Sequence, residues 1–217
     1  MLPHHIITAV HFLTIDVGHQ LSTASPRIIG AAIFTGSVEH GEVEFRLDAT
    51  VLGPRSPIAS LLPWLNEHID PQATIAGYDL IQAASLLARC SSGLNPGITH
   101  ALAGRGRHPV IELSDASSDD DAAAFILACL QADLPFSSPN ASDDFAAWMM
   151  RRPVPLVHRL ELDVITVWRM AMARIEARTD LGRRVSSVIE EHLTDWLKAA
   201  NFPAGAIHLD SLSAAEG

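Results

Sequence analysis

Apolar residues form short runs at the start of the chain and recur at helical spacing towards its end. Residues 9–17 and 27–35 are mostly apolar, which predicts two buried strands. Residues 42–50 alternate between apolar and polar side chains, so they predict a half-exposed strand, paired through a turn at residues 36–41. The pattern therefore predicts three antiparallel strands first.

The remaining chain alternates between helix and strand and then becomes helical. The expected elements are helices over 58–68, 79–90, 118–131, 143–150, 157–178 and 183–199, short strands over 73–78 and 108–113, and a loop over 91–106. This order predicts an α/β domain of three layers with a mixed sheet and a helical C-terminal part. We assign residues 1–180 to the main domain, 181–200 to a C-terminal helix, and 201–217 to a tail, disordered over 211–217.

The last predicted helix carries an apolar stripe. Six apolar residues recur at helical spacing: Val185, Val188, Ile189, Leu193, Trp196 and Leu197. Such a stripe packs either on the core of its own chain or on a second copy in a homodimer, and the sequence leaves both open.

The composition is that of a globular protein. A hydrophobic content of 48% in 217 residues can fill a core, and no apolar run approaches the ~20 residues that span a bilayer. The N-terminus lacks a basic region followed by an apolar one, so we expect no signal peptide and a cytoplasmic location. Cys90 and Cys129 are expected to be buried, reduced thiols.

The net charge of −10 changes the expectation about partners. Tight, sequence-independent binding of nucleic acid usually relies on a basic surface, because neutralised phosphates release counterions. An acidic protein can still hold nucleic acid through metal ions and local arginines. Arg151 and Arg152 are either such a phosphate contact or an exposed loop pair.

Three segments carry candidate chemistry. The first predicted strand ends on Asp16, and side chains two apart on a strand share a face, so Gly18 should stand beside it. In nucleases that hold two metal ions, this second place is normally Glu. Asp79 follows a short strand and can cap the next helix, while Asp163 lies on the long helix together with His158.

With these elements in place, residues 12–173 resemble the DEDD 3′–5′ exonucleases of the ribonuclease-H-like fold. The closest likeness is to predicted exonucleases related to the proofreading domains of family B polymerases. The resemblance implies magnesium or manganese ions held by Asp16, Asp163 and Asp79, with one ion activating water and the other stabilising the leaving 3′ oxygen. It implies His158 as the candidate general base.

The same resemblance suggests nucleic-acid contacts. Arg159 takes the place of the tyrosine of the third motif, in the segment 155–166. Arg89 matches the arginine of the helix that follows the second motif. The partner implied is a single-stranded 3′ end.

Departures from the family pattern affect the expected activity. Gly18 replaces the motif glutamate, and the metal-binding aspartate of the second motif would fall near Gln82 or Ala83. We therefore expect an exonuclease-like protein that acts on or binds single-stranded 3′ ends, with impaired or lost two-metal catalysis. The alternative is a non-catalytic module that binds protein or nucleic acid.

Two structural details decide between these readings. Arg159 and Asp163 are four residues apart on a helix, which predicts an ion pair. If they pair, Arg159 supplies the positive charge that a metal ion would have provided. Glu112, on a neighbouring strand, is a carboxylate that could reach in as a substitute ligand.

Overall fold

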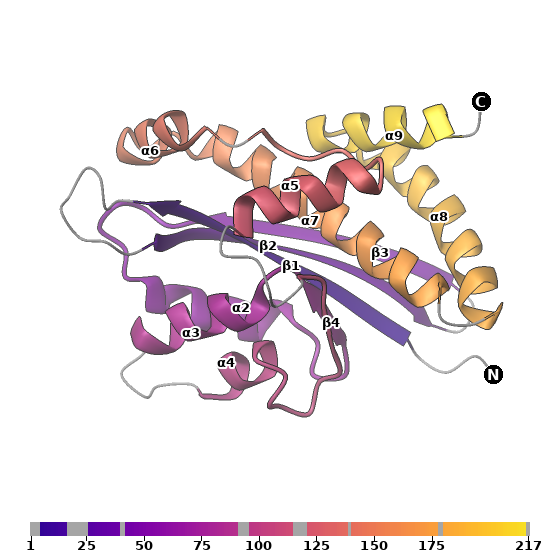
Figure 1. Cartoon of the computed structure of the whole chain (residues 1–217), viewed down its shortest axis with the longest axis horizontal. Coiled ribbons are helices and arrows are strands. Elements are labelled where there is room, and N and C mark those ends of the chain that lie inside the picture. Colours follow the sequence, from indigo (N-terminus) through magenta and orange to yellow (C-terminus); the bar gives the residue numbers. More distant parts are fainter. Residues whose placement is uncertain are drawn as a thin grey trace.

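A five-stranded mixed sheet forms the centre of the molecule (Figure 1). The computed structural model describes residues 5–16, 26–39, 42–90, 96–114, 121–138, 140–177 and 180–215. The strands are β1 (His5–Asp16), β2 (Pro26–Glu39), β3 (Glu42–Val51), β4 (Thr74–Gly77) and β5 (Val110–Glu112), in the order β3-β2-β1-β4-β5. β1, β2 and β3 are antiparallel neighbours, and β4 and β5 run parallel to β1. The prediction of a mixed sheet that begins with three antiparallel strands is confirmed.

Helices cover both faces of this sheet (Figure 1). They are η1 (Ile58–Ser60), α2 (Leu61–His68), α3 (Leu80–Cys90), α4 (Pro96–Leu102), α5 (Asp121–Gln131), α6 (Ala141–Met149), α7 (Pro153–Glu176), α8 (Asp180–Ala200) and α9 (Pro203–Ala215). Ala9, Leu13 and Ile15 of β1 pack into a core with α7, whereas Val10 packs into a second core with α2, α3 and α4. The arrangement is consistent with three layers.

The long helix α7 crosses the antiparallel strands and packs against them. The Trp168 indole Nε1 donates to the Ile7 carbonyl at 3.2 Å and packs edge-on against Phe34. A Cβ atom at Gly36 would lie 2.7 Å from the Trp168 ring, so only glycine fits there. The predicted turn over 36–41 is therefore wrong in its first residues: β2 continues to Glu39, and Gly36 admits the indole instead of turning the chain.

Two helices lie where the sequence predicted none. α4 falls in the expected loop over 91–106, and its residues Ile98, Ala101 and Leu102 are buried. α9 occupies most of the expected tail over 201–217, so the prediction of disorder from Ser211 onward is wrong up to Ala215.

The buried His208 fastens α9 to α7. His208 is fully buried, and its Nε2 donates to the Leu162 carbonyl at 3.1 Å. Burial lowers the pKa of His208 to about 4. A neutral imidazole thus joins the C-terminal helix to the body of the domain.

The apolar stripe of α8 packs on its own chain. Ile189 and Leu193 are buried, and the Trp196 ring lies 5.4 Å from Phe34 and 5.7 Å from Phe202. The side chain of Val185 lies outside what the structure describes. Packing within the chain therefore covers Ile189, Leu193 and Trp196 of the stripe, whereas Val188 is 50% exposed.

The structure bears on two further expectations, the burial of the cysteines and the absence of a membrane-spanning helix. Cys129 is buried as predicted, but Cys90 at the end of α3 is exposed, so the prediction of two buried thiols is wrong for that residue. Within the described part of the chain, no helix combines the length and the apolar character that crossing a membrane requires.

Candidate functional site

Asp163 lies in the interior, on the side of α7 that faces the sheet. Only 2% of the residue is exposed. Its Oδ1 accepts from the Ser137 amide at 2.7 Å, and its Oδ2 accepts from the Ser137 hydroxyl at 2.5 Å. One turn later, the Thr166 hydroxyl donates to the Pro135 carbonyl. The loop between α5 and α6 is thereby bound to α7 through the Asp163 carboxylate.

Cationic and imidazole groups complete the surroundings of Asp163. Arg159 Nε lies 3.9 Å from Asp163 Oδ2, and Arg159 Nη1 forms an ion pair with Asp144 of α6. His11 Nε2, from the middle of β1, lies 3.7 Å from the same Oδ2. The ion pair predicted between Arg159 and Asp163 is confirmed, and the arginine bridges two carboxylates.

His11 is held neutral at this site. Its ring stacks on Phe125 of α5, with ring centroids 5.5 Å apart. Burial lowers the pKa of His11, against the opposing attraction of Asp163 and with a further lowering by Arg159. Burial, together with Asp163, also raises the pKa of the nearby Cys129 thiol to about 12.

These groups do not fit a divalent metal ion at Asp163. The Ser137 amide and hydroxyl hydrogen-bond to the two carboxylate oxygens, and Arg159 already contributes a positive charge. Among the residues that the structure describes, no three His, Cys, Asp or Glu side chains are placed to hold a metal. A second cation beside Arg159 would meet repulsion that a metal site avoids.

The first-strand aspartate of the prediction lies elsewhere. Asp16 is the last residue of β1, where its backbone pairs with Pro26. Its side chain, and all of Gly18, lie outside the described residues. Asp163 contacts His11 instead. His11 precedes Asp16 by five residues on β1, which corresponds to about 16 Å along an extended strand.

The Glu112 carboxylate accepts amides at the N-terminus of α3. The amides of Asp79 and Leu80 donate to the Glu112 carboxylate at 2.8 and 2.9 Å, and the Ser114 hydroxyl donates to it at 2.9 Å. Asp79 itself has a left-handed backbone, with φ of 59°. Glu112, considered as a substitute metal ligand, therefore binds the free amides at the start of a helix instead.

The remaining predicted residues are not brought together. His158 is exposed on α7, and its position is about 140° around the helix from Asp163. Arg89 is exposed at the end of α3, a helix that covers the opposite face of the sheet from α7. The structure thus separates the predicted base and one predicted nucleic-acid contact from the Asp163 cluster, which we define as His11, Ser137, Asp144, Arg159 and Asp163.

His11 is the residue of this cluster that sequence reasoning missed. Its signal was present, because a histidine interrupts an otherwise apolar strand on the face that also carries Leu13. What the sequence does not provide is the position of α7 along β1, which decides which strand residue meets Asp163.

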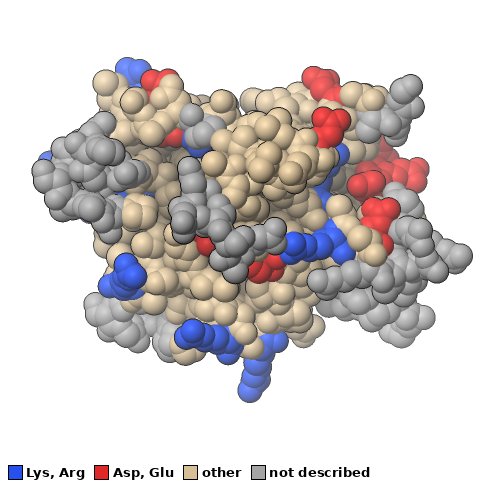
Figure 2. Space-filling model, viewed as in Figure 1, with Lys and Arg blue, Asp and Glu red and all other residues tan. Residues whose placement is uncertain are grey.

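Charged side chains are dispersed over the face of the molecule shown in Figure 2. Basic and acidic groups alternate there with uncharged surface, and no continuous basic area covers the described part of that face. A search for similar proteins found no matching family model, no matching curated protein and no matching solved structure.

Proposed function

We propose that the protein is an exonuclease-type domain of the ribonuclease-H-like fold that has lost two-metal catalysis and binds single-stranded nucleic-acid ends. The observation that carries the proposal is the state of Asp163, whose carboxylate is engaged by Ser137 and Arg159 of its own chain. The residue that would bind metal in such a family acts here as a structural acceptor.

The fold supports this assignment. Three antiparallel strands precede two parallel ones, helices cover both faces, and a late helix carries Asp163 across the first strand. In the family that the sequence resembles, acidic residues of the first strand share metal ions with the aspartate of the late helix. A carboxylate on β1 would have to stand opposite Asp163 to do so.

The β1 positions opposite Asp163 carry no carboxylate. His11 contacts Asp163, and the next residue on the same face is Leu13, only 3% exposed. Two divalent ions bring four positive charges, which several carboxylates must offset. At this point of the structure the chain supplies an imidazole, a leucine and a guanidinium.

A nuclease assay tests the loss of catalysis. Native protein and Asp163→Asn are incubated with a labelled single-stranded oligonucleotide and manganese. We expect equal, background-level release of nucleotides from both. Manganese-dependent digestion by the native protein that disappears in Asp163→Asn would show that Asp163 is a working ligand and would overturn the proposal.

Retained binding is tested separately. We expect the fluorescence anisotropy of a labelled single strand to rise on addition of the native protein at low salt, and this rise to diminish as salt displaces the phosphate contacts. A double-stranded probe of the same sequence is the control, and absence of any single-strand binding would refute this part of the proposal.

A further inference from the structure

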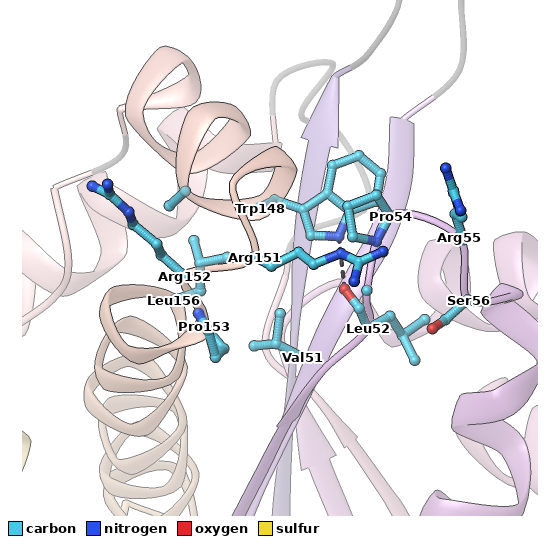
Figure 3. A pocket seen from close by; sticks show the side chains of 12 residues that line it. Val51, Leu52, Pro54, Arg55, Ser56, Trp148, Arg151, Arg152, Pro153 and Leu156 are labelled. Atoms are coloured by element: carbon cyan, nitrogen blue, oxygen red, sulfur yellow. Dashed lines mark hydrogen bonds between the residues drawn. The ribbon is translucent and has the colours of Figure 1, made fainter.

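A pocket of about 340 Å³ opens where the loop after β3 meets the junction of α6 and α7 (Figure 3). Its apolar wall includes Leu52, Pro54, Pro153 and Leu156. The Trp148 indole is buried behind it and donates to the Leu52 carbonyl at 2.7 Å. A volume of this size is at the lower end of small-molecule sites, and it exceeds what a bare inorganic ion needs.

Arginines from separate parts of the chain surround this pocket. Arg55, Arg151 and Arg152 line it and are exposed, and none of the 12 lining residues drawn in Figure 3 is acidic. Figure 3 shows Arg151 extending across the pocket towards Leu52, whereas the guanidinium ends of Arg152 and Arg55 point outward on its two sides. In a chain of net charge −10, this concentration of guanidinium groups is a local exception.

A further arginine supports the pocket from behind. Arg27 of β2 donates from Nη2 to the Ser56 carbonyl at 2.9 Å, and its guanidinium lies 5.2 Å from the centre of the Trp148 ring. Arg27 thus binds the loop that carries Arg55 to the helix that precedes Arg151. The two backbone segments that carry the lining arginines are therefore joined through Arg27.

The backbone at Arg151 shows that this arginine is placed at a conformational cost. Arg151 has a φ of 54°, the left-handed region that favours glycine. Its amide donates to the Trp148 carbonyl at 3.1 Å and the Arg152 amide donates to Ala147 at 2.8 Å, which is the hydrogen-bond pattern of a glycine-terminated helix. The same ending occurs at Asp133 of α5, so what distinguishes Arg151 is that its side chain lines a pocket.

The start of α7 adds to the same preference for anions. Pro153 and Pro155 lack amide hydrogens, so the Val154 amide is the donor left at this end of the helix. No acidic residue is present in the first turn of α7. The positive end of a long helix dipole therefore remains without a carboxylate beside the arginines.

We infer that this pocket, which we call the arginine pocket, binds a phosphate group through Arg151, with the attached sugar and base against its apolar wall and with Arg152 and Arg55 adding positive charge at its rim. Arginine guanidinium groups suit phosphate because they donate two parallel hydrogen bonds. The phosphate belongs either to a mononucleotide or to a nucleic-acid strand. Only the second source rests on the function proposed above.

Calorimetric titration with inorganic phosphate and with thymidine monophosphate tests the pocket itself. Native protein is compared with Arg151→Gly, which removes the guanidinium while giving the backbone the residue that its φ favours. We expect binding of thymidine monophosphate to the native protein to exceed that of inorganic phosphate. We expect Arg151→Gly to weaken it ~10-fold or more, as for loss of a charged hydrogen bond.

Two variants control for this change. Asp133 has a φ of 52° at the end of α5, where its amide and that of Leu134 make the same pair of hydrogen bonds as at Arg151. Asp133→Gly therefore removes the same kind of backbone strain at a residue that does not line the pocket, and it should not weaken binding. Arg105→Ala removes an exposed arginine that does not line the pocket, and it measures the effect of net charge alone.

Each outcome discriminates. Equal affinity of the native protein and Arg151→Gly for thymidine monophosphate, or no binding by either, overturns the inference. Binding that depends on Arg151 without any binding of a single-stranded oligothymidylate leaves the arginine pocket standing and refutes nucleic-acid binding. An oligothymidylate that binds native protein and Arg151→Gly equally supports the proposed function and refutes the pocket as its phosphate site.

Discussion

The helix α7 joins two regions that both contain arginine and differ in what faces the guanidinium. In the Asp163 cluster, Arg159 lies between the carboxylates of Asp144 and Asp163. In the arginine pocket, Arg151 and Arg152 are exposed beside an apolar wall without a lining carboxylate. The first arginine is neutralised inside the molecule, so its charge serves stability. The charges of Arg151 and Arg152 remain available to a ligand.

The two regions can also be compared in their backbone conformation. Around Asp163, regular helix and strand positions bring the groups together, and the carboxylate accepts hydrogen bonds on both oxygens. At the arginine pocket the chain keeps an arginine at φ of 54°. The helix that precedes the Ser137 loop ends in the same way at Asp133, with φ of 52°, so the difference lies in the side chain: at the arginine pocket the residue with positive φ is an arginine that faces the pocket.

Thiol reactivity should show the largest difference between the two regions. The pKa of Cys129, beside Asp163, is raised from 9.0 to about 12, so its reactive thiolate is about 1000-fold scarcer than that of an ordinary thiol. In a Cys90→Ser background we expect Cys129 to resist a maleimide reagent at mildly alkaline pH. Arg55→Cys in the same background places a thiol at the open pocket and should react at least a thousandfold faster. Similar rates would show that the Asp163 cluster is open to solvent.

Removal of the buried carboxylate should cost the most stability. Asp163→Ala leaves the Ser137 amide and hydroxyl without their acceptor and removes one of the two carboxylates beside Arg159, so we expect a loss of about 3 kcal/mol in the free energy of unfolding. Urea denaturation measures it. Asp195→Ala is the matched control, because Asp195 is 74% exposed on α8 and should change stability by less than about 0.5 kcal/mol. A similar small change for both would contradict a structural role for Asp163.

Acid should lower the free energy of unfolding through His11. We expect this loss to be smaller than the loss caused by Asp163→Ala. The pKa of His11 is below 6.5 in the folded protein because of burial, while the unfolded chain takes up a proton near 6.5. Stability from the neutral ring is therefore fully present above that pH and declines as pH falls below it.

The pH effect can be separated by substitution. His11→Phe keeps a ring against Phe125 and cannot be protonated, so unfolding at a series of pH values should fall less steeply towards acid than in the native protein. Arg151→Gly should leave the slope unchanged, because Arg151 lies outside the Asp163 cluster. A steeper decline for His11→Phe would reverse the assignment.

Relief of the strained residue should give the smallest effect and one of opposite sign. Arg151→Gly is expected to raise the free energy of unfolding by about 1 kcal/mol, because glycine adopts positive φ without penalty. Thermal unfolding should show a midpoint higher by about 2–4 °C for a domain of this size. A destabilised variant would mean that Arg151 is kept for the fold and not for a ligand.

The sequence predicted the elements whose apolar spacing is regular. The strands of the antiparallel half and the helix α8 follow from such spacing, whereas α3 was predicted from a capping residue, Asp79, at its start. α4 was missed because its glycine and proline residues suggested a loop, although three of its apolar residues are buried in the structure. α9 was missed because its small and polar residues show little helical periodicity, and its buried His208 depends on a carbonyl of α7.

The candidate site was predictable only where its contacts are local. Arg159 and Asp163 are one helical turn apart, so their ion pair could be inferred from spacing. The contacts of Asp163 with Ser137 and His11 join segments far apart in the chain, and they depend on how α7 lies on the sheet. The same holds for the arginine pocket, because only the folded chain brings Arg55 to Arg151.

Calorimetric titration with manganese of native protein and Asp163→Asn addresses most directly the claim that Asp163 is a structural carboxylate. Because its oxygens are occupied by Ser137 and balanced by Arg159, the two proteins should give the same binding isotherm. A manganese site in the native protein that vanishes in the folded Asp163→Asn variant would contradict the account.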